Sequence, residues 1–123
     1  MNAMDAIGTR VSTRTFEAGK PGPGGVEALE RLIGKASREA APFGSAVKLG
    51  LALGEGEAKP ARMGTYGLIS GAFAFAAAAA VPGPGAFEDL GWVLEGFVLE
   101  ATALGWDSCW IGGLFDRTAA AAA

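Results

Sequence analysis

The sequence predicts a protein of the α/β or α+β class, because helical and extended patterns alternate along the chain. Apolar residues recur at helical spacing over residues 26–36 and 87–104. Two other stretches, residues 47–53 and 72–81, have the composition and spacing of strands. The length of 123 residues fits one compact domain, and we expect a single domain over residues 1–123.

A short helix and an extended segment are expected at the start of the chain. Asp5 stands where a capping acid belongs, which predicts a brief helix within residues 2–8. Residues 10–16 carry β-branched side chains at alternate positions and indicate an extended segment. The glycines and prolines of residues 19–25 predict a loop before the helix of residues 26–36.

The two predicted strands differ in how clearly the sequence indicates them. Residues 47–53 alternate in character, and a polar turn follows over residues 54–57. Residues 72–81 are rich in alanine, which favours helix, but Phe73 and Phe75 alternate and the segment lies between a glycine and a proline. We therefore expect a central strand there.

The last third of the chain contains the strongest helical pattern. Residues 87–104 are apolar almost all round, which predicts a helix buried in the core or against a second subunit and ended by Gly105. Asp116 predicts the capped start of a final helix that stops after little more than a turn. We expect either that the chain is truncated there or that its tail, residues 119–123, stands for residues of unestablished identity.

The composition excludes several kinds of catalytic site. The chain has no histidine, which excludes Ser-His-Asp and Cys-His nucleophiles and histidine-ligated metals. Its single cysteine, Cys109, excludes an internal disulfide and cysteine-cluster metal sites, and it suits a reducing cytoplasm. We therefore expect no metal and no catalytic side chain, and any chemistry is expected to come from a bound cofactor.

Charge and hydropathy exclude two classes of partner. The net charge of −3 and the pI near 4.9 argue against a nucleic-acid partner. The N-terminus lacks the basic stretch and apolar core of a secretory signal. The uncharged run between residues 62 and 88 alternates small residues with turn formers, so a buried strand explains it better than a membrane helix. We expect a cytoplasmic protein without a membrane partner.

Two short motifs carry residues suited to binding. Arg10, Ser12 and Arg14 are two residues apart, so an extended segment would present two guanidinium groups and a hydroxyl to an anion. On spacing alone, ordinary surface pairs with Asp5 and Glu17 are favoured.

The second motif follows the predicted helix of residues 87–104. Here Trp110 and Ile111 precede Gly112 and Gly113, whose missing Cβ atoms would let a ring or a ligand approach the backbone N–H groups. A tight turn beneath an apolar core would use these glycines equally well.

Together, the Arg-x-Ser-x-Arg-x-Phe segment and residues 94–113, which end in Cys-Trp-Ile-Gly-Gly, resemble the nitroreductase family of flavoproteins. The nearest likeness is to a compact branch of that family, which residues 63–69 also resemble. The resemblance implies an α+β fold, a three-layer α/β/α sandwich around a mixed, mainly antiparallel sheet. It also implies a homodimer with FMN at the subunit interface, and hydride transfer from NADH or NADPH through the flavin to nitroaromatics, quinones or similar small electron-poor acceptors.

The same resemblance assigns the candidate cofactor-binding residues. Arg10, Ser12 and Arg14 match the residues that hold the FMN phosphate. The loop over the flavin ring is matched by Trp110, Ile111, Gly112 and Gly113, where a backbone N–H is expected to hydrogen-bond the ring.

The sequence also departs from the family pattern. Glycine stands where several members have a glutamate in the flavin loop, and residues 42–45 replace a common Asn-x-Gln-Pro-Trp segment. Two other functions therefore stay open: a flavin-binding protein without turnover, and a non-functional structural fragment of the fold.

Overall fold

The computed structural model describes residues 1–17, 19–54, 63–65 and 67–123. Residues 55–57 of the predicted turn, and Tyr66 within residues 63–69, lie outside this described part. The elements in chain order are α1 (Ala3–Thr9), α2 (Gly25–Arg38), β1 (Val47–Leu53), β2 (Ala74–Ala80), α3 (Ala86–Ala103) and α4 (Arg117–Ala122). The mixture of helices with an antiparallel strand pair confirms the expected α+β class.

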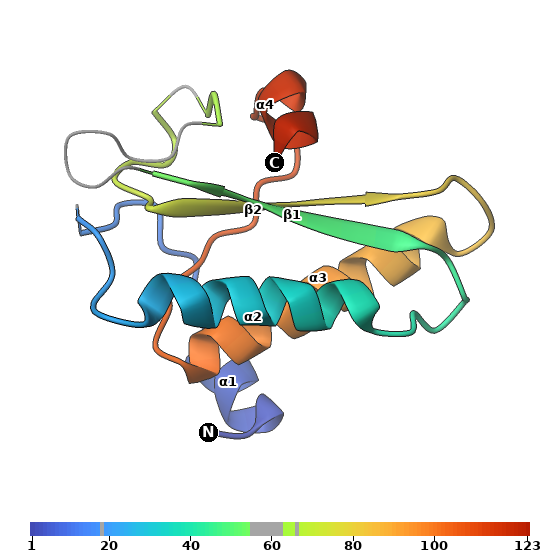
Figure 1. Cartoon of the computed structure of the whole chain (residues 1–123), viewed down its shortest axis with the longest axis horizontal. Helices are drawn as coiled ribbons and strands as arrows, with labels where there is room; N and C mark the ends of the chain where they lie inside the picture. The colour runs from blue at the N-terminus through green and yellow to red at the C-terminus, as the bar shows by residue number, and fades with distance from the viewer. Residues whose placement is uncertain (18, 55–62, 66) are drawn as a thin grey trace.

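The elements are stacked in layers about the strand pair (Figure 1). Helices α2 and α3 contact each other and cover one face of β1 and β2, while α1 packs against α3 on the side away from the strands. Helix α4 lies over the opposite face. Gly50 of β1 permits this close approach, because a Cβ at that position would overlap the backbone of Ala123.

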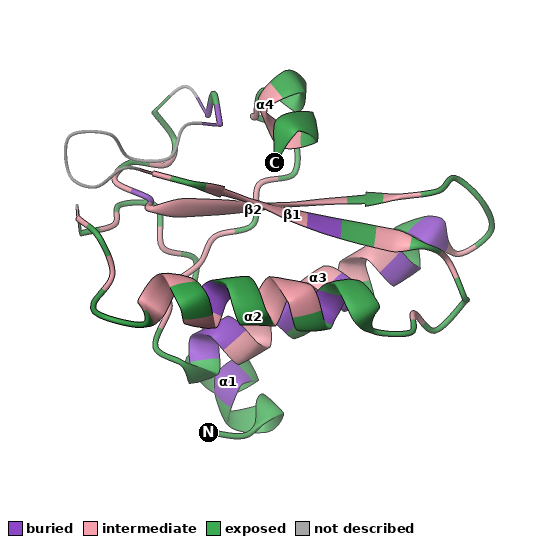
Figure 2. Ribbon diagram, viewed as in Figure 1, coloured by how far each residue is buried: buried purple, intermediate pink, exposed green. Residues whose placement is uncertain are grey.

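The core lies between the strand pair and the two long helices. Buried side chains concentrate on the facing sides of α2 and α3, whereas the outer side of α2 is largely exposed (Figure 2). Burial of these apolar side chains provides most of the favourable free energy of folding. The buried cluster consists of Leu29, Ala36, Leu49, Val93, Phe97 and Val98.

Most predicted elements occur where the sequence places them. Strand β1 coincides with residues 47–53, and β2 lies within the predicted 72–81, so tertiary pairing overrides the helical preference of alanine. Helix α1 begins with a capping box, in which Asn2 accepts the Asp5 N–H and the Asp5 carboxylate accepts the Asn2 N–H. At α4, the Asp116 carboxylate accepts two backbone N–H bonds, as the predicted cap requires.

The expected extended segment of residues 10–16 makes isolated parallel bridges at Ser12 and Thr15 rather than a longer strand. Helix α3, which is expected to be buried in the core or against a second subunit, is covered only in part by the single chain, since Phe87 is 90% exposed and Trp92 is 49% exposed. None of the helices in the described ranges has the length and hydropathy needed to cross a membrane.

Candidate functional site

Two segments that are distant in the sequence pair with the N-terminal extended segment of residues 10–16. Ser12 pairs in parallel with Ser108, and the Thr13 N–H donates to the Ser108 carbonyl at 2.9 Å. Further along, the Ser70 N–H donates to the Arg14 carbonyl at 2.9 Å, and the Phe16 N–H donates back to the Ser70 carbonyl at 2.9 Å. The structure therefore places the Arg-x-Ser-x-Arg motif beside the segment that leads into Trp110.

Glycine is required at position 71, next to the hydrogen bonds that Ser70 forms with Arg14 and Phe16. Its φ is +77°, a left-handed backbone conformation that side chains disfavour, and a Cβ there would overlap the carbonyl oxygen of Phe16. Glycine thus allows the backbone after Ser70 to approach the extended segment closely.

Arg10 reaches a hollow at the junction of these segments. Its guanidinium donates from Nη1 to the Val11 carbonyl at 3.2 Å and to Ser108 Oγ at 3.5 Å. The hollow has a volume of about 180 Å³, and Arg10, Thr102, Trp106 and Ser108 are among its lining residues. Typical cofactor pockets measure about 300–1,000 Å³, so this hollow matches one polar group of a cofactor rather than a whole flavin nucleotide.

The other two residues of the first motif lie elsewhere on the surface. The side chains of Ser12 and Arg14 are exposed and do not line this hollow. Surface pairing with Asp5 and Glu17 is not found either: in the described part of the chain, the single ion pair joins Lys35 to Glu100 at 2.6 Å. The guanidinium groups of Arg10 and Arg14 thus form no ion pair with a described carboxylate.

The second motif forms an open loop between α3 and α4. Trp110 is 44% exposed, and its indole Nε1–H donates to Glu95 Oε2 on α3 at 2.8 Å. Ile111 is half-buried, while Gly112 and Gly113 are exposed, and a Cβ built on either glycine meets no atom within 4 Å. These glycines are therefore not needed for packing in the described structure, which argues against the tight-turn interpretation.

The comparison with known protein families decides the assignment. The model of the family described as "Putative TM nitroreductase" matches residues 2–123. The chain belongs to this nitroreductase family. Membership supports an oxidoreductase role in a generally flavin-dependent family. Neither a curated protein nor a solved structure matches the chain.

Two groups of residues are available to contact the two ends of a flavin nucleotide. At the pairing of Ser12 with Ser108, which we call the seam, Arg10 forms no described ion pair and lies beside the Ser108 hydroxyl. Both the guanidinium and the hydroxyl can donate hydrogen bonds to a phosphate, and Asp107 lines the same hollow. At Gly112 and Gly113, the open space leaves the backbone accessible to a planar ring. In this chain, Arg10 and Ser12 lie next to Ser108. The described contacts do not join Ile111, Gly112 or Gly113 directly to the seam, and these residues are connected to it through the chain.

Two residues of this arrangement were missed by sequence reasoning. Ser108 lies two residues before the second motif, and no pattern in the sequence singles it out. Glu95 had a signal, because a carboxylate is unusual in the middle of a helix that is apolar almost all round. Its partner, Trp110, is 15 residues away, and such a pairing is set by the fold rather than by spacing.

A buried carboxylate, that of Asp89, binds a neighbouring segment at the N-terminal end of α3. Asp89 has no exposed surface, and its side chain accepts the Phe43 N–H at 2.8 Å and the Ser45 N–H at 2.9 Å. Burial raises the pKa of Asp89, but the hydrogen bonds from Ser45 and from the backbone of Phe43 outweigh burial and hold this pKa below its usual value. Asp89 thereby fixes the segment of residues 42–45 on α3.

Proposed function

We propose that this nitroreductase-family chain is an FMN-dependent oxidoreductase that uses NADH or NADPH to reduce a small electron-poor acceptor, such as a nitroaromatic or a quinone. When bound, FMN supplies the hydride and electron transfer. The observation that carries the proposal is the seam at Ser108, because it joins the two motifs whose combination resembles the flavin site of the family.

The side chains and backbone of this chain would bind and orient the cofactor. Arg10, Ser12 and Arg14 would hold the phosphate through charge-assisted hydrogen bonds. The loop from Trp110 to Gly113 would cover the ring, with a backbone N–H of the glycine pair donating to it. The same loop would exclude water from one side of the ring.

The proposal includes a homodimer with FMN at the subunit interface. Its support is the apolar surface left on α1 and α3, where large side chains remain exposed in the single chain. Burying them against a second subunit would also agree with the apolar sequence of α3. These side chains are Met4, Ile7, Phe87, Trp92 and Leu104.

A visible absorption spectrum of the purified protein tests the function directly. After FMN is added and excess is removed, we expect retained flavin bands that bleach on addition of NADPH, or otherwise of NADH, without oxygen. Bands that persist with both donors would indicate a flavin-binding protein without turnover. A protein that does not retain FMN would contradict the proposal and would support a structural fragment.

A further inference from the structure

We infer that Glu95 is a positioning residue: by accepting the indole N–H of Trp110, it holds the flavin loop on α3. The inference rests on the proposed function, which gives this loop a ring to cover. Glu95 itself would touch neither FMN nor the acceptor, and it would act through the orientation of Trp110.

The geometry of the contact is that of a strong hydrogen bond. Trp110 Nε1 and Glu95 Oε2 are 2.8 Å apart, within the range of charge-assisted bonds. Tryptophan has one polar hydrogen and two side-chain torsions, so a bond at Nε1 restrains the orientation of the whole ring system. Glu95 on α3 thus restrains the orientation of the Trp110 indole.

The loop has few other attachments. In the described structure, the stretch between Ser108 and Asp116 is joined to the rest of the fold by a single hydrogen bond, the one from Trp110 to Glu95. The Cys109 thiol bonds only to the carbonyl of its neighbour Trp110. Loss of the Glu95 carboxylate would therefore remove the described hydrogen bond that holds this stretch between its two ends, which are fixed by the bonds of Ser108 and Asp116.

Helix α3 is a rigid support for this bond. Val93, Phe97 and Val98 flank Glu95 and belong to the buried core. Lys35 of α2 also pairs with Glu100, five residues further along α3. A group anchored at Glu95 is consequently anchored to a helix that contributes three side chains to the core.

The first measurement tests the bond itself in protein without flavin. Proton–nitrogen NMR spectra contain one indole N–H signal for each of Trp92, Trp106 and Trp110, and the Trp110→Phe variant identifies the third. We expect Glu95→Ala to shift that signal and to accelerate its hydrogen exchange. The matched control, Glu100→Ala on the same helix, should leave the signal unchanged, and an unchanged signal in Glu95→Ala would overturn the inference.

The second measurement tests positioning through FMN titrations. We expect Glu95→Ala to weaken FMN binding about fivefold, the scale of one partly exposed hydrogen bond. Glu95→Gln keeps an acceptor oxygen and should restore most of the affinity. The double variant Glu95→Ala/Trp110→Phe should bind no more weakly than the weaker single variant, because both changes remove the same bond.

The outcomes separate this inference from the proposed function. A shifted indole signal with unchanged FMN affinity would overturn positioning while leaving the oxidoreductase proposal intact. Equal losses of affinity in Glu95→Ala and Glu100→Ala would also overturn it, because the effect would then be one of general stability. Failure of the unmodified protein to bind FMN would overturn the proposed function, and the positioning role with it, whatever the indole signal.

Discussion

At the scale of single residues, the two arginines of the first motif occupy different surroundings. Arg10 lines the hollow and contacts Ser108, whereas Arg14 uses its backbone carbonyl to bind Ser70 and leaves its side chain exposed. If both hold the phosphate, binding would draw the Arg14 side chain toward an anion seated near Arg10. Arg14 is therefore the sharper test of the phosphate site, because its side chain makes no described hydrogen bond without the ligand.

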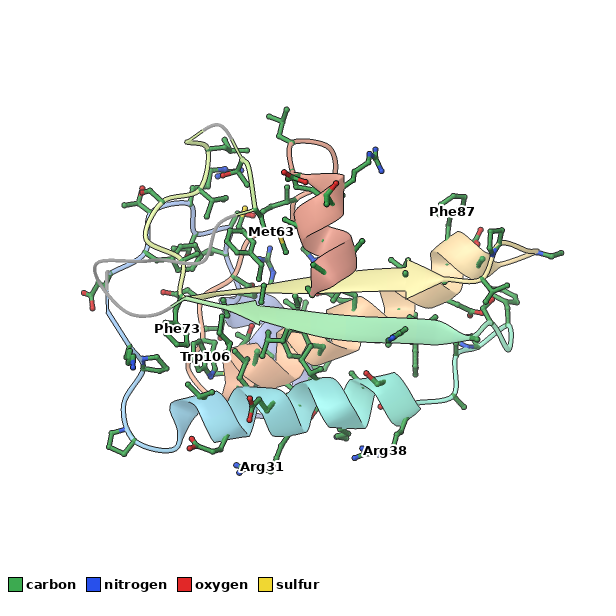
Figure 3. The ribbon with its side chains drawn as sticks, turned by 45° about the horizontal axis from the view of Figure 1, so that its top comes forward. Arg31, Arg38, Met63, Phe73, Phe87 and Trp106 are labelled. Carbon is green, nitrogen blue, oxygen red and sulfur yellow. The ribbon has the colours of Figure 1, made fainter. Side chains whose placement is uncertain are left out.

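Replacing Arg14 with alanine should weaken FMN binding by about 1.5–3 kcal/mol, the scale for loss of a charge-assisted hydrogen bond. Fluorescence quenching of added FMN measures the affinity. Arg31→Ala is the matched control, because Arg31 points away from the body of the molecule on the outer side of α2 (Figure 3). Unchanged affinity in Arg14→Ala would remove this residue from the site.

Gly113 offers a test of the loop that leaves the fold intact. A Cβ there meets no atom within 4 Å, so Gly113→Val should unfold at nearly the same temperature as the unmodified protein. Its side chain should nevertheless block approach of the flavin ring and reduce FMN binding at least tenfold, on the order of 1.4 kcal/mol. Calorimetry and FMN titration measure the two effects, and normal binding and reduction of FMN would show that the loop is assigned wrongly.

The candidate residues of the site could be named from the sequence, whereas the contacts between the segments that carry them could not. Arg10, Arg14 and Gly113 belong to local motifs that can be recognised in one dimension. The contacts of Ser108 and Glu95 depend on which segments the fold brings together, and one-dimensional spacing carries no such information. The resemblance to the nitroreductase family indicated that the two motifs act together, which neither motif indicates alone.

At the scale of elements, α3 contacts α1, α2 and both strands. Its first turn holds residues 42–45 through Asp89, its middle holds Trp110 through Glu95, and its end contributes Thr102 to the hollow. Sequence periodicity predicted this helix to within one residue at each end. The role of Asp89 was not predicted, because an acid in the first turn of a helix is also an ordinary partner of the helix dipole.

The Asp89 contacts predict a particular response to acid. Because the folded-state pKa is lowered, the ionised carboxylate stabilises the fold above the unfolded-state pKa near 3.8, and this contribution is lost as the pH falls through the folded-state value. Asp89→Asn should lower Tm at pH 7 by roughly 5–10 °C, since one acceptor and the charge are lost. It should also lose less stability than the unmodified protein as the pH falls below 3.8.

Thermal unfolding at several pH values measures both effects. Glu88→Gln, one residue earlier on α3 and exposed, is the control and should behave like the unmodified protein. An Asp89→Asn variant with unchanged Tm and the same acid sensitivity would show that these contacts contribute nothing to stability.

At the scale of the whole molecule, the small core and the exposed apolar side chains favour association. Trp92 is half exposed on α3, where an apolar surface of this kind is costly in water. Sedimentation velocity should give twice the 12.4 kDa mass of one chain. Trp92→Glu should shift the protein toward monomer, whereas Arg38→Glu on the outer side of α2 should not. A monomer at every concentration would contradict the proposed dimer.

The fold class and order of elements were predictable, but the exposure of α3 was not. A helix that is apolar on every side indicates burial without identifying what buries it. In the single chain, α1, α2 and the strands cover α3 in part, and Trp92 remains half exposed. The proposed dimer would account for this exposed surface, and a pattern along one chain does not identify such a partner.

The composition of β2 has a consequence for how the chain reaches its native pairing. Alanines occupy positions 76–80 opposite positions 47–51 of β1, so displacement of one strand by two residues would leave most cross-strand neighbours unchanged. Side chains along the ladder thus distinguish poorly between the native register and its nearest alternatives. The large side chain of β2 that distinguishes the native register is Phe75, which lies opposite Ala52. We therefore expect folding to include a search among nearly equivalent pairings, which would slow the formation of a strand pair that is otherwise simple in topology.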